Sequence, residues 1–291
     1  MKNVSFYAPG AKFYENEYHK NNREKFKSIS ISGNNCILNC PHCGGQMLKN
    51  MINAETPQRL SDICDNLISE GCEGILLSGG CNKAASVDLM PFCDVISKIS
   101  KKIKIAVHCG FATNDTLLGL KNSGVSTVFF DVIGSAQTIK SILGINADVN
   151  DYAEKLLYMK KIGLECSPHI IIGLDYGKIK GEYAALETVA KICSKQLVLV
   201  VLKPLKGTEM EKVSPPPINE VFAFFKEAVK KIPGEDISLG CARPSGQYSI
   251  LLEKKALDLG FSKISYPSPQ TIEYAYKNGY NIKFFDTCCA L

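Results

Sequence analysis

Three cysteines near the amino terminus have the spacing of a metal-binding loop. Cys36, Cys40 and Cys43 are separated by three and then two residues, and Gly44-Gly45 follow directly. Three thiolates can hold three irons of a cubane cluster and leave the fourth iron open to a small chelating ligand. We therefore predict that this loop binds a 4Fe-4S cluster with one open coordination position.

Two other kinds of site remain open for this loop. A zinc knuckle needs four closed ligands, and the local fourth donor, His42, lies inside the loop, where a tetrahedral site would be cramped. A ferredoxin-like electron carrier needs a fourth cysteine in a defined spacing and has little use for a chain of 291 residues. A zinc- or cluster-stabilised scaffold that binds a partner without catalysis is the corresponding non-enzymatic alternative.

The chain has 13 cysteines and no recognisable export signal, which indicates metal or redox chemistry rather than a disulfide framework. Several of these cysteines need no function, because cysteine among Ile, Leu and Val behaves as a small hydrophobe. We interpret four residues in this way: Cys64, Cys72, Cys93 and Cys193.

A second group of thiols invites a functional interpretation. Cys241 follows a predicted strand, and Cys288-Cys289 have no predicted core to fill. A tail that folds back could bring the pair beside Cys241, and three thiolate ligands favour a second, auxiliary iron-sulfur cluster. The alternatives are that these thiols are inert, or that Cys109 and Cys166 join Cys241 instead.

Short β-rich runs alternate with amphipathic stretches, as in repeated βα units around a parallel sheet. The first crossover is well marked, since Thr56-Pro57 gives a helix start and Gly71 a stop. We predict strands at 28–32, 74–78, 103–108, 126–131, 165–172, 197–202, 237–240 and 263–266.

These elements predict one α/β domain over residues 1–291, a (βα)8 TIM-type barrel. Residues 1–27 form an N-terminal extension, and residues 280–291 form a cysteine-bearing tail over the barrel mouth. Functional loops in such barrels follow the carboxyl ends of the strands. Those positions hold the cysteine loop, Ser78-Gly79-Gly80, Asp131 and Cys241.

Charge and hydropathy exclude several classes of function. The net charge of +5 is mild and the lysines are scattered, so we expect no nucleic-acid partner. No apolar run approaches the roughly 20 residues of a membrane helix, so we expect no membrane partner. Without an export signal, we expect a cytoplasmic protein.

The CxxxCxxC motif directly after the first predicted strand of a βα barrel resembles the radical SAM superfamily. The resemblance implies that S-adenosylmethionine chelates the open iron and is cleaved by reduction. The resulting 5′-deoxyadenosyl radical abstracts hydrogen from unactivated carbon. Family members place an aromatic residue near the adenine at the position of His42; a loop histidine facing solvent is the alternative.

The same resemblance assigns roles at three further strand ends. Ser78-Gly79-Gly80 correspond to the segment that meets the amino group of the bound methionine, although Cys81 replaces the family's common Glu. Asp131 corresponds to the contact with the ribose hydroxyls, and Ile172 belongs to the segment that packs on adenine. A tight turn, a capping Asp and an ordinary buried strand are the respective alternatives.

Within the superfamily the chain resembles the biotin synthase-like branch, in particular the two-protein lipoyl synthases. This resemblance implies sulfur insertion at C6 or C8 of an octanoyl chain on a lipoyl-domain or glycine-cleavage H protein, with sulfur from the auxiliary cluster. It also implies a second radical SAM protein and an electron donor such as ferredoxin or flavodoxin. Cys109, Cys166 and Cys241 fall roughly where biotin synthase holds its 2Fe-2S cluster. Another radical SAM reaction, such as hydrogen abstraction for rearrangement or for complex maturation, is the alternative.

Overall fold

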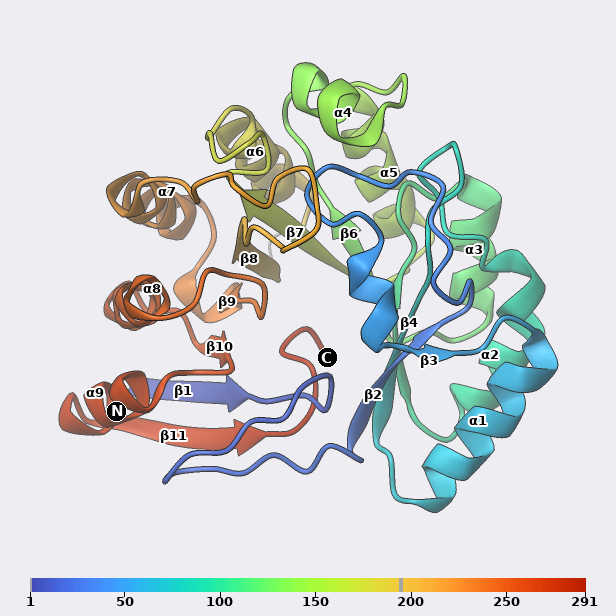
Figure 1. Ribbon diagram of the computed structural model, residues 1–291, viewed down its shortest axis with the longest axis horizontal. Helices are drawn as coiled ribbons and strands as arrows, with labels where there is room; N and C mark the ends of the chain where they lie inside the picture. The colour runs from blue at the N-terminus through green and yellow to red at the C-terminus, as the bar shows by residue number, and fades with distance from the viewer. Residues whose placement is uncertain (1, 194–195) are drawn as a thin grey trace.

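A single curled parallel sheet organises the protein (Figure 1). The computed structural model describes residues 2–193 and 196–291. The 11 strands are arranged in the order β11-β1-β10-β9-β8-β7-β6-β5-β4-β2-β3. Their bounds are β1 (Lys2–Tyr7), β2 (Phe26–Ser30), β3 (Ile52–Asn53), β4 (Gly74–Ser78), β5 (Lys104–His108), β6 (Thr127–Asp131), β7 (Cys166–Ile172), β8 (Leu197–Val201), β9 (Ile237–Leu239), β10 (Lys263–Ser265) and β11 (Tyr280–Phe285).

Helices cover the convex outer face of this curled sheet (Figure 1). We call the region inside its concave face, where Phe129, Val198 and Ala290 pack together, the lumen. The α-helices are α1 (Pro57–Ser69), α2 (Cys93–Ile99), α3 (Asn114–Asn122), α4 (Ala136–Leu143), α5 (Val149–Lys161), α6 (Glu182–Ile192), α7 (Ile218–Lys231), α8 (Gln247–Asp258) and α9 (Pro269–Lys277). The start of α1 is as predicted, because the Thr56 side chain accepts a hydrogen bond from the Arg59 backbone N–H.

The prediction of an α/β barrel is confirmed in its class, but the strand number was wrong. The eight predicted strands correspond to β2 and β4 to β10, and the sheet adds β1, β3 and β11. β1 lies in the predicted extension and pairs in parallel with both β10 and β11. The sheet ends at β11 and β3, so it is an open half-barrel.

Two apolar layers lie on the two faces of the sheet. β8 is buried along its whole length, as expected for a parallel strand covered on both sides. Outward residues join the main core with the helices, whereas Ala106, Phe129, Val198 and Val200 form a separate cluster with Ala290. This second cluster lines the lumen.

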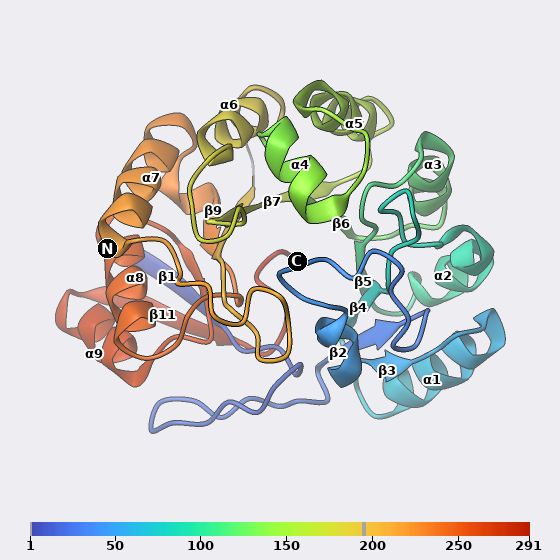
Figure 2. The same cartoon turned by 45° about the horizontal axis from the view of Figure 1, so that its top comes forward.

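The carboxyl-terminal residues enter the lumen and do not cover its mouth (Figure 2). The Ser167 hydroxyl donates to the Ala290 carbonyl at 3.3 Å, and the Gln196 amide donates to the Cys289 carbonyl at 3.5 Å. Both donors lie at the amino ends of strands, β7 and β8. The predicted tail is therefore present but lies deeper than expected, because its small apolar residues fill the lumen.

No helix among the described residues combines the length and the apolar character that crossing a bilayer requires.

Candidate functional site: two groups of thiols at one half-barrel

The cysteine loop follows β2 and ends in the short 3₁₀ helix Gln46–Asn50. It turns tightly, because the Cys40 carbonyl accepts from the backbone N–H groups of both Cys43 (3.1 Å) and Gly44 (2.8 Å). Gly44 and Gly45 have φ of +51° and +68°, a region that favours glycine. Interaction with the Cys40 thiol lowers the pKa of Cys43 to about 4, so this thiol is ready to act as a thiolate ligand.

The segment after β8 holds this loop from the opposite side of the mouth. The Met210 backbone N–H donates to the Pro41 carbonyl at 3.1 Å, and the Gln46 side chain donates to the Lys206 carbonyl at 2.7 Å. The loop is therefore held by a segment far away in the sequence, since Gln46 and Lys206 are 160 residues apart.

The residues present fit an iron-sulfur cluster. Within residues 2–193 and 196–291, no three His, Cys, Asp or Glu side chains are gathered as metal ligands, so the three thiols must converge when a cluster binds. The donors are nevertheless three cysteines on one short loop, and one of them has a strongly lowered pKa. The buried Nδ1 of His42 has no hydrogen-bond partner among the described residues, as expected of an atom that awaits a ligand.

The glycine pair after β4 lies directly against the cysteine loop. A Cβ atom at Gly80 would come within 1.8 Å of the Asn35 carbonyl oxygen and 2.6 Å of the Cys36 Cα atom. The Gly80 backbone N–H donates to the Ser32 hydroxyl at 2.6 Å, and the Cys81 carbonyl accepts from the Ile37 N–H at 2.9 Å. Only glycine permits this approach of the two loops.

Asp131 ends β6 within a group of histidines that the sequence analysis missed. His108 Nε2, at the end of β5, lies 3.1 Å from Asp131 Oδ2. Asp131 and His169 are register neighbours on β6 and β7. Burial alone raises the pKa of Asp131, but the charges of His108, His169 and His42 lower it to about 2. Both histidines could have been found from the alternation of side chains along their strands, because each lies two residues from a side chain that faces the lumen.

A small cavity of about 20 Å³ opens beside Asp131. Its lining includes Ile171 and Thr138, whose buried hydroxyl has no partner among the described residues. Ile172 does not line this cavity and belongs to the core beneath the helices. The alternation of β7 directs Ile171 inward and Ile172 outward, and the adenine contact expected of Ile172 stays a prediction.

The second group of thiols comes together in part. Cys288 interacts directly with Cys289 and lowers its pKa to about 7. Desolvation raises the pKa of Cys241, and the nearby charge at Cys289 raises it further. The Cys241 side chain nevertheless remains accessible, as expected at the rim of an open lumen. These three thiols are not gathered as metal ligands among the described residues either, so they too would have to converge around a cluster.

The alternative trio does not assemble. Cys109 is fully buried in the main core, and Cys166 packs against that same core. Both residues lie on the helix side of the sheet, whereas Ala242, next to Cys241, packs against the lumen cluster. Cys64 and Cys72 are buried in the main core as predicted, and Cys193 packs against it.

The fold and this arrangement define a class: α/β half-barrel proteins with a three-cysteine loop after an early strand of the sheet. Residues 30–178, about half of the chain, match the family described as the Radical SAM superfamily. The chain belongs to this superfamily and is a radical SAM enzyme. Membership implies a 4Fe-4S cluster and S-adenosylmethionine as its cofactors.

Two curated relatives carry the name biotin synthase. The chain is 24% identical over 218 residues to that of Nitrosopumilus maritimus (strain SCM1), covering 70% of this chain and 66% of the relative. It is 28% identical over 135 residues to that of Cenarchaeum symbiosum (strain A), covering 46% and 42% respectively. The match thus spans less than two thirds of either relative, and it supports the biotin synthase-like branch.

Solved structures share the fold. Methylornithine synthase (PylB) superposes with a TM-score of 0.58 at 14% identity, over 92% of this chain and 73% of that one. HydG, a maturase of the [FeFe]-hydrogenase, gives a TM-score of 0.61 at 14% identity, over 91% and 57%. At these identities the likeness concerns the fold alone.

Proposed function

We propose that this enzyme inserts sulfur into an unactivated C–H bond of an octanoyl chain carried on a protein lysine, as one component of a lipoyl synthase. The observation that carries the proposal is the second group of thiols, Cys241 after β9 and Cys288-Cys289 in the tail that enters the lumen. These thiols would hold an auxiliary iron-sulfur cluster, which would be the source of the sulfur.

The lumen walls suit an alkyl substrate. Phe129, Val198 and Val200 present apolar surface inward, together with Leu76. The tail residue Ala290 packs on this surface, so an octanoyl chain would displace the tail before burying its methylene groups there, at about 0.8 kcal/mol each. Likeness to proteins named biotin synthase supports the same type of reaction.

Four features of the chain would prepare S-adenosylmethionine for cleavage. The thiolates of Cys36, Cys40 and Cys43 would hold the cluster, which when bound supplies the electron for this cleavage. The backbone of Gly79-Gly80, beside the cysteine loop, would meet the methionine part. The Asp131 carboxylate, kept ionised by His108, would accept hydrogen bonds from the ribose hydroxyls. His42, whose buried Nδ1 has no partner among the described residues, would lie beside the adenine.

The partners in this proposal follow from the reaction. The octanoyl chain would arrive on a lipoyl-domain or H protein, a second radical SAM protein would complete the product, and a ferredoxin or flavodoxin would supply electrons. A reducing cytoplasm suits 13 cysteines, among which the described ones form no disulfide.

Anaerobic reconstitution followed by product analysis tests the proposal. We expect about eight irons per chain and sulfur transfer to an octanoylated lipoyl domain. Saturation at about four irons, unchanged when Cys288 and Cys289 become Ala, would remove the auxiliary cluster. 5′-Deoxyadenosine formation without any sulfur in the octanoyl product would instead leave a radical SAM enzyme of another specificity.

A further inference from the structure

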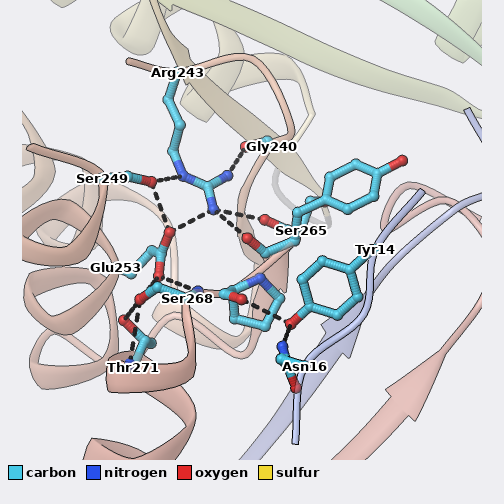
Figure 3. Close-up of polar contacts among 11 residues, drawn as sticks. Tyr14, Asn16, Gly240, Arg243, Ser249, Glu253, Ser265, Ser268 and Thr271 are labelled. Atoms are coloured by element: carbon cyan, nitrogen blue, oxygen red, sulfur yellow. Dashed lines mark hydrogen bonds and ion pairs between the residues drawn. The ribbon is translucent and has the colours of Figure 1, made fainter. Parts of the chain in front are cut away.

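The loop that carries Cys241 is clamped by one buried arginine (Figure 3). The Arg243 guanidinium donates to the Gly240 carbonyl at 2.6 Å and to the Ser249 hydroxyl at 2.8 Å. It also donates to the Ser265 carbonyl at 2.7 Å and the Tyr266 carbonyl at 3.1 Å, at the end of β10. Cys241 therefore lies between two points, Gly240 and Arg243, that are tied to each other and to the neighbouring strand.

A carboxylate completes this clamp. Arg243 Nη2 lies 2.7 Å from Glu253 Oε1 on α8, and the two side chains are 4% and 1% exposed. Glu253 in turn accepts from the backbone N–H and the hydroxyl of Ser268, both at 2.7 Å. A buried ion pair of this kind adds little net stability, but it disfavours every arrangement that leaves one charge unpaired. This network is thus suited to fixing one position of the loop.

A separate contact fixes the tail. His19 Nε2 lies 2.7 Å from Asp286 Oδ1, and the Asn22 backbone N–H donates to Asp286 Oδ2 at 3.1 Å. The His19 ring also stacks on Phe284, with ring centroids 4.7 Å apart. Asp286 stands two residues before Cys288, so the N-terminal segment grips the tail where it leaves β11.

The two contacts share one strap, residues 8–22. Tyr14 in this strap donates to the Pro267 carbonyl at 2.7 Å, beside the Arg243 network (Figure 3). Buried Asn21 closes the strap on itself by donating to the carbonyls of Ala8 (3.0 Å), Pro9 (3.3 Å) and Lys12 (3.0 Å). One segment thus touches both the β10 end and the β11 end.

From these contacts we infer that Arg243 and His19 are positioning residues of the second thiol group. Arg243 fixes the loop that carries Cys241, and His19, through Asp286, fixes the tail that carries Cys288 and Cys289. The role of these residues in holding a cluster rests on the proposed function. The nearness of Cys241 to Cys288-Cys289, in contrast, can be tested in the protein without any cluster. The strap, which precedes the cysteine loop in the sequence, thus positions the tail that carries Cys288 and Cys289.

The test uses the full-length, cluster-free protein and a short bifunctional thiol reagent, with mass spectrometry to identify bridged peptides. In the unsubstituted protein we expect a bridge between Cys241 and the Cys288-Cys289 peptide. His19→Ala should reduce its yield about tenfold, since a hydrogen bond to a charged group is lost. His19→Gln keeps a donor toward Asp286 and should restore most of the yield.

Arg243→Lys tests the contact that fixes the loop carrying Cys241. Lysine keeps the charge but lacks the planar five-donor fork, so we expect a similar loss of the bridge. Ser249→Ala removes one acceptor from Arg243 and one donor to Glu253, and serves where the lysine variant does not fold. Lys102→Ala, which removes an exposed ion pair with Asp65, is the matched control and should leave the yield unchanged. A bridge between Cys40 and Cys43 serves as an internal standard.

The outcomes separate the two proposals. Undiminished bridging in folded His19→Ala and Arg243→Lys proteins would overturn the positioning roles, as would the absence of a Cys241 bridge in the unsubstituted protein. A wild-type iron content of about four with normal bridging would remove the auxiliary cluster and leave the geometry intact.

Discussion

His108 Nε2 lies 3.1 Å from Asp131 Oδ2 and links the carboxyl ends of β5 and β6 inside the lumen. The contact brings a cationic partner to the one carboxylate that the sequence placed at the cofactor site. It also holds the Asp131 side chain in a defined orientation. Both residues are therefore open to direct tests.

Asp131→Asn should weaken binding of S-adenosylmethionine about tenfold, equivalent to about 1.4 kcal/mol, because the amide is a poorer acceptor for ribose hydroxyls. His108→Ala should have a smaller effect in the same direction, since it removes the partner and not the contact. Equilibrium binding to the reconstituted protein measures both. Unchanged affinity in Asp131→Asn would place the ribose elsewhere.

Cys36→Ala, Cys40→Ala and Cys43→Ala should each abolish 5′-deoxyadenosine formation. The cysteines lie on a loop, so the thermal unfolding midpoint of the cluster-free protein should change little. Cys93→Ala, outside the two groups of thiols, is the control and should keep full activity. Cleavage retained by any of the three loop variants would contradict the cluster assignment.

Gly80→Ala should disrupt the mouth without unfolding the barrel. The added methyl carbon would lie 1.8 Å from the Asn35 carbonyl oxygen, so the cysteine loop must move. We expect a cost of about 1–3 kcal/mol in unfolding free energy and a larger loss of iron binding. At Gly119 the nearest obstacle is the flexible Met90 side chain, at 2.9 Å, and Gly119→Ala should retain iron. Normal iron loading in Gly80→Ala would refute the close approach.

The Arg243–Glu253 pair predicts a specific acid sensitivity. Burial raises the pKa of Glu253, but the charge of Arg243 and several hydrogen bonds outweigh it and hold the pKa below its ordinary value of 4.5. A carboxyl with a lowered folded-state pKa stabilises the protein above pH 4.5, and this stabilisation is lost as the pH falls through the folded-state value. Glu253→Gln should therefore lower the unfolding free energy by about 3 kcal/mol at pH 7, because it leaves Arg243 buried without its counter-charge.

Denaturant unfolding of both proteins between neutral and acidic pH measures this difference. The gap between wild type and Glu253→Gln should narrow at the acid end, where the wild-type carboxyl takes up a proton. A gap that stays constant over the whole pH range would show that Glu253 does not titrate as described.

The sequence predicted the class of the fold because each strand of a covered parallel sheet is a short apolar run. β8 (Leu197–Val201) is such a run. β1 was missed because it lies before the first βα unit and has exposed residues at its start, and the edge strand β11 was missed because its exposed and buried residues alternate. β3, with two residues, is too short to leave a pattern.

The site was predictable where a local motif carries the chemistry. Cys36, Cys40 and Cys43 are a contiguous signal, and Gly79-Gly80 follows a clear strand. An all-apolar run such as the end of β7 hides which of Ile171 and Ile172 faces inward. His19 and Asp286, 267 residues apart, form a contact that depends on the pairing of β1 with β11, which no local sequence pattern shows.

The central place of β1, between β10 and β11, has a consequence for biosynthesis. β1, the first of the described strands along the chain, pairs only with β10 and β11, which are the last two. Until residues 263–285 have emerged, the apolar side chains of Val4 and Phe6 and the β1 backbone have no sheet to join. Closure of this contact spans nearly the whole sequence, and such long loops are the slow step of folding. The last step in forming the sheet is therefore the pairing of β1 with β10 and β11, next to the strap and the tail.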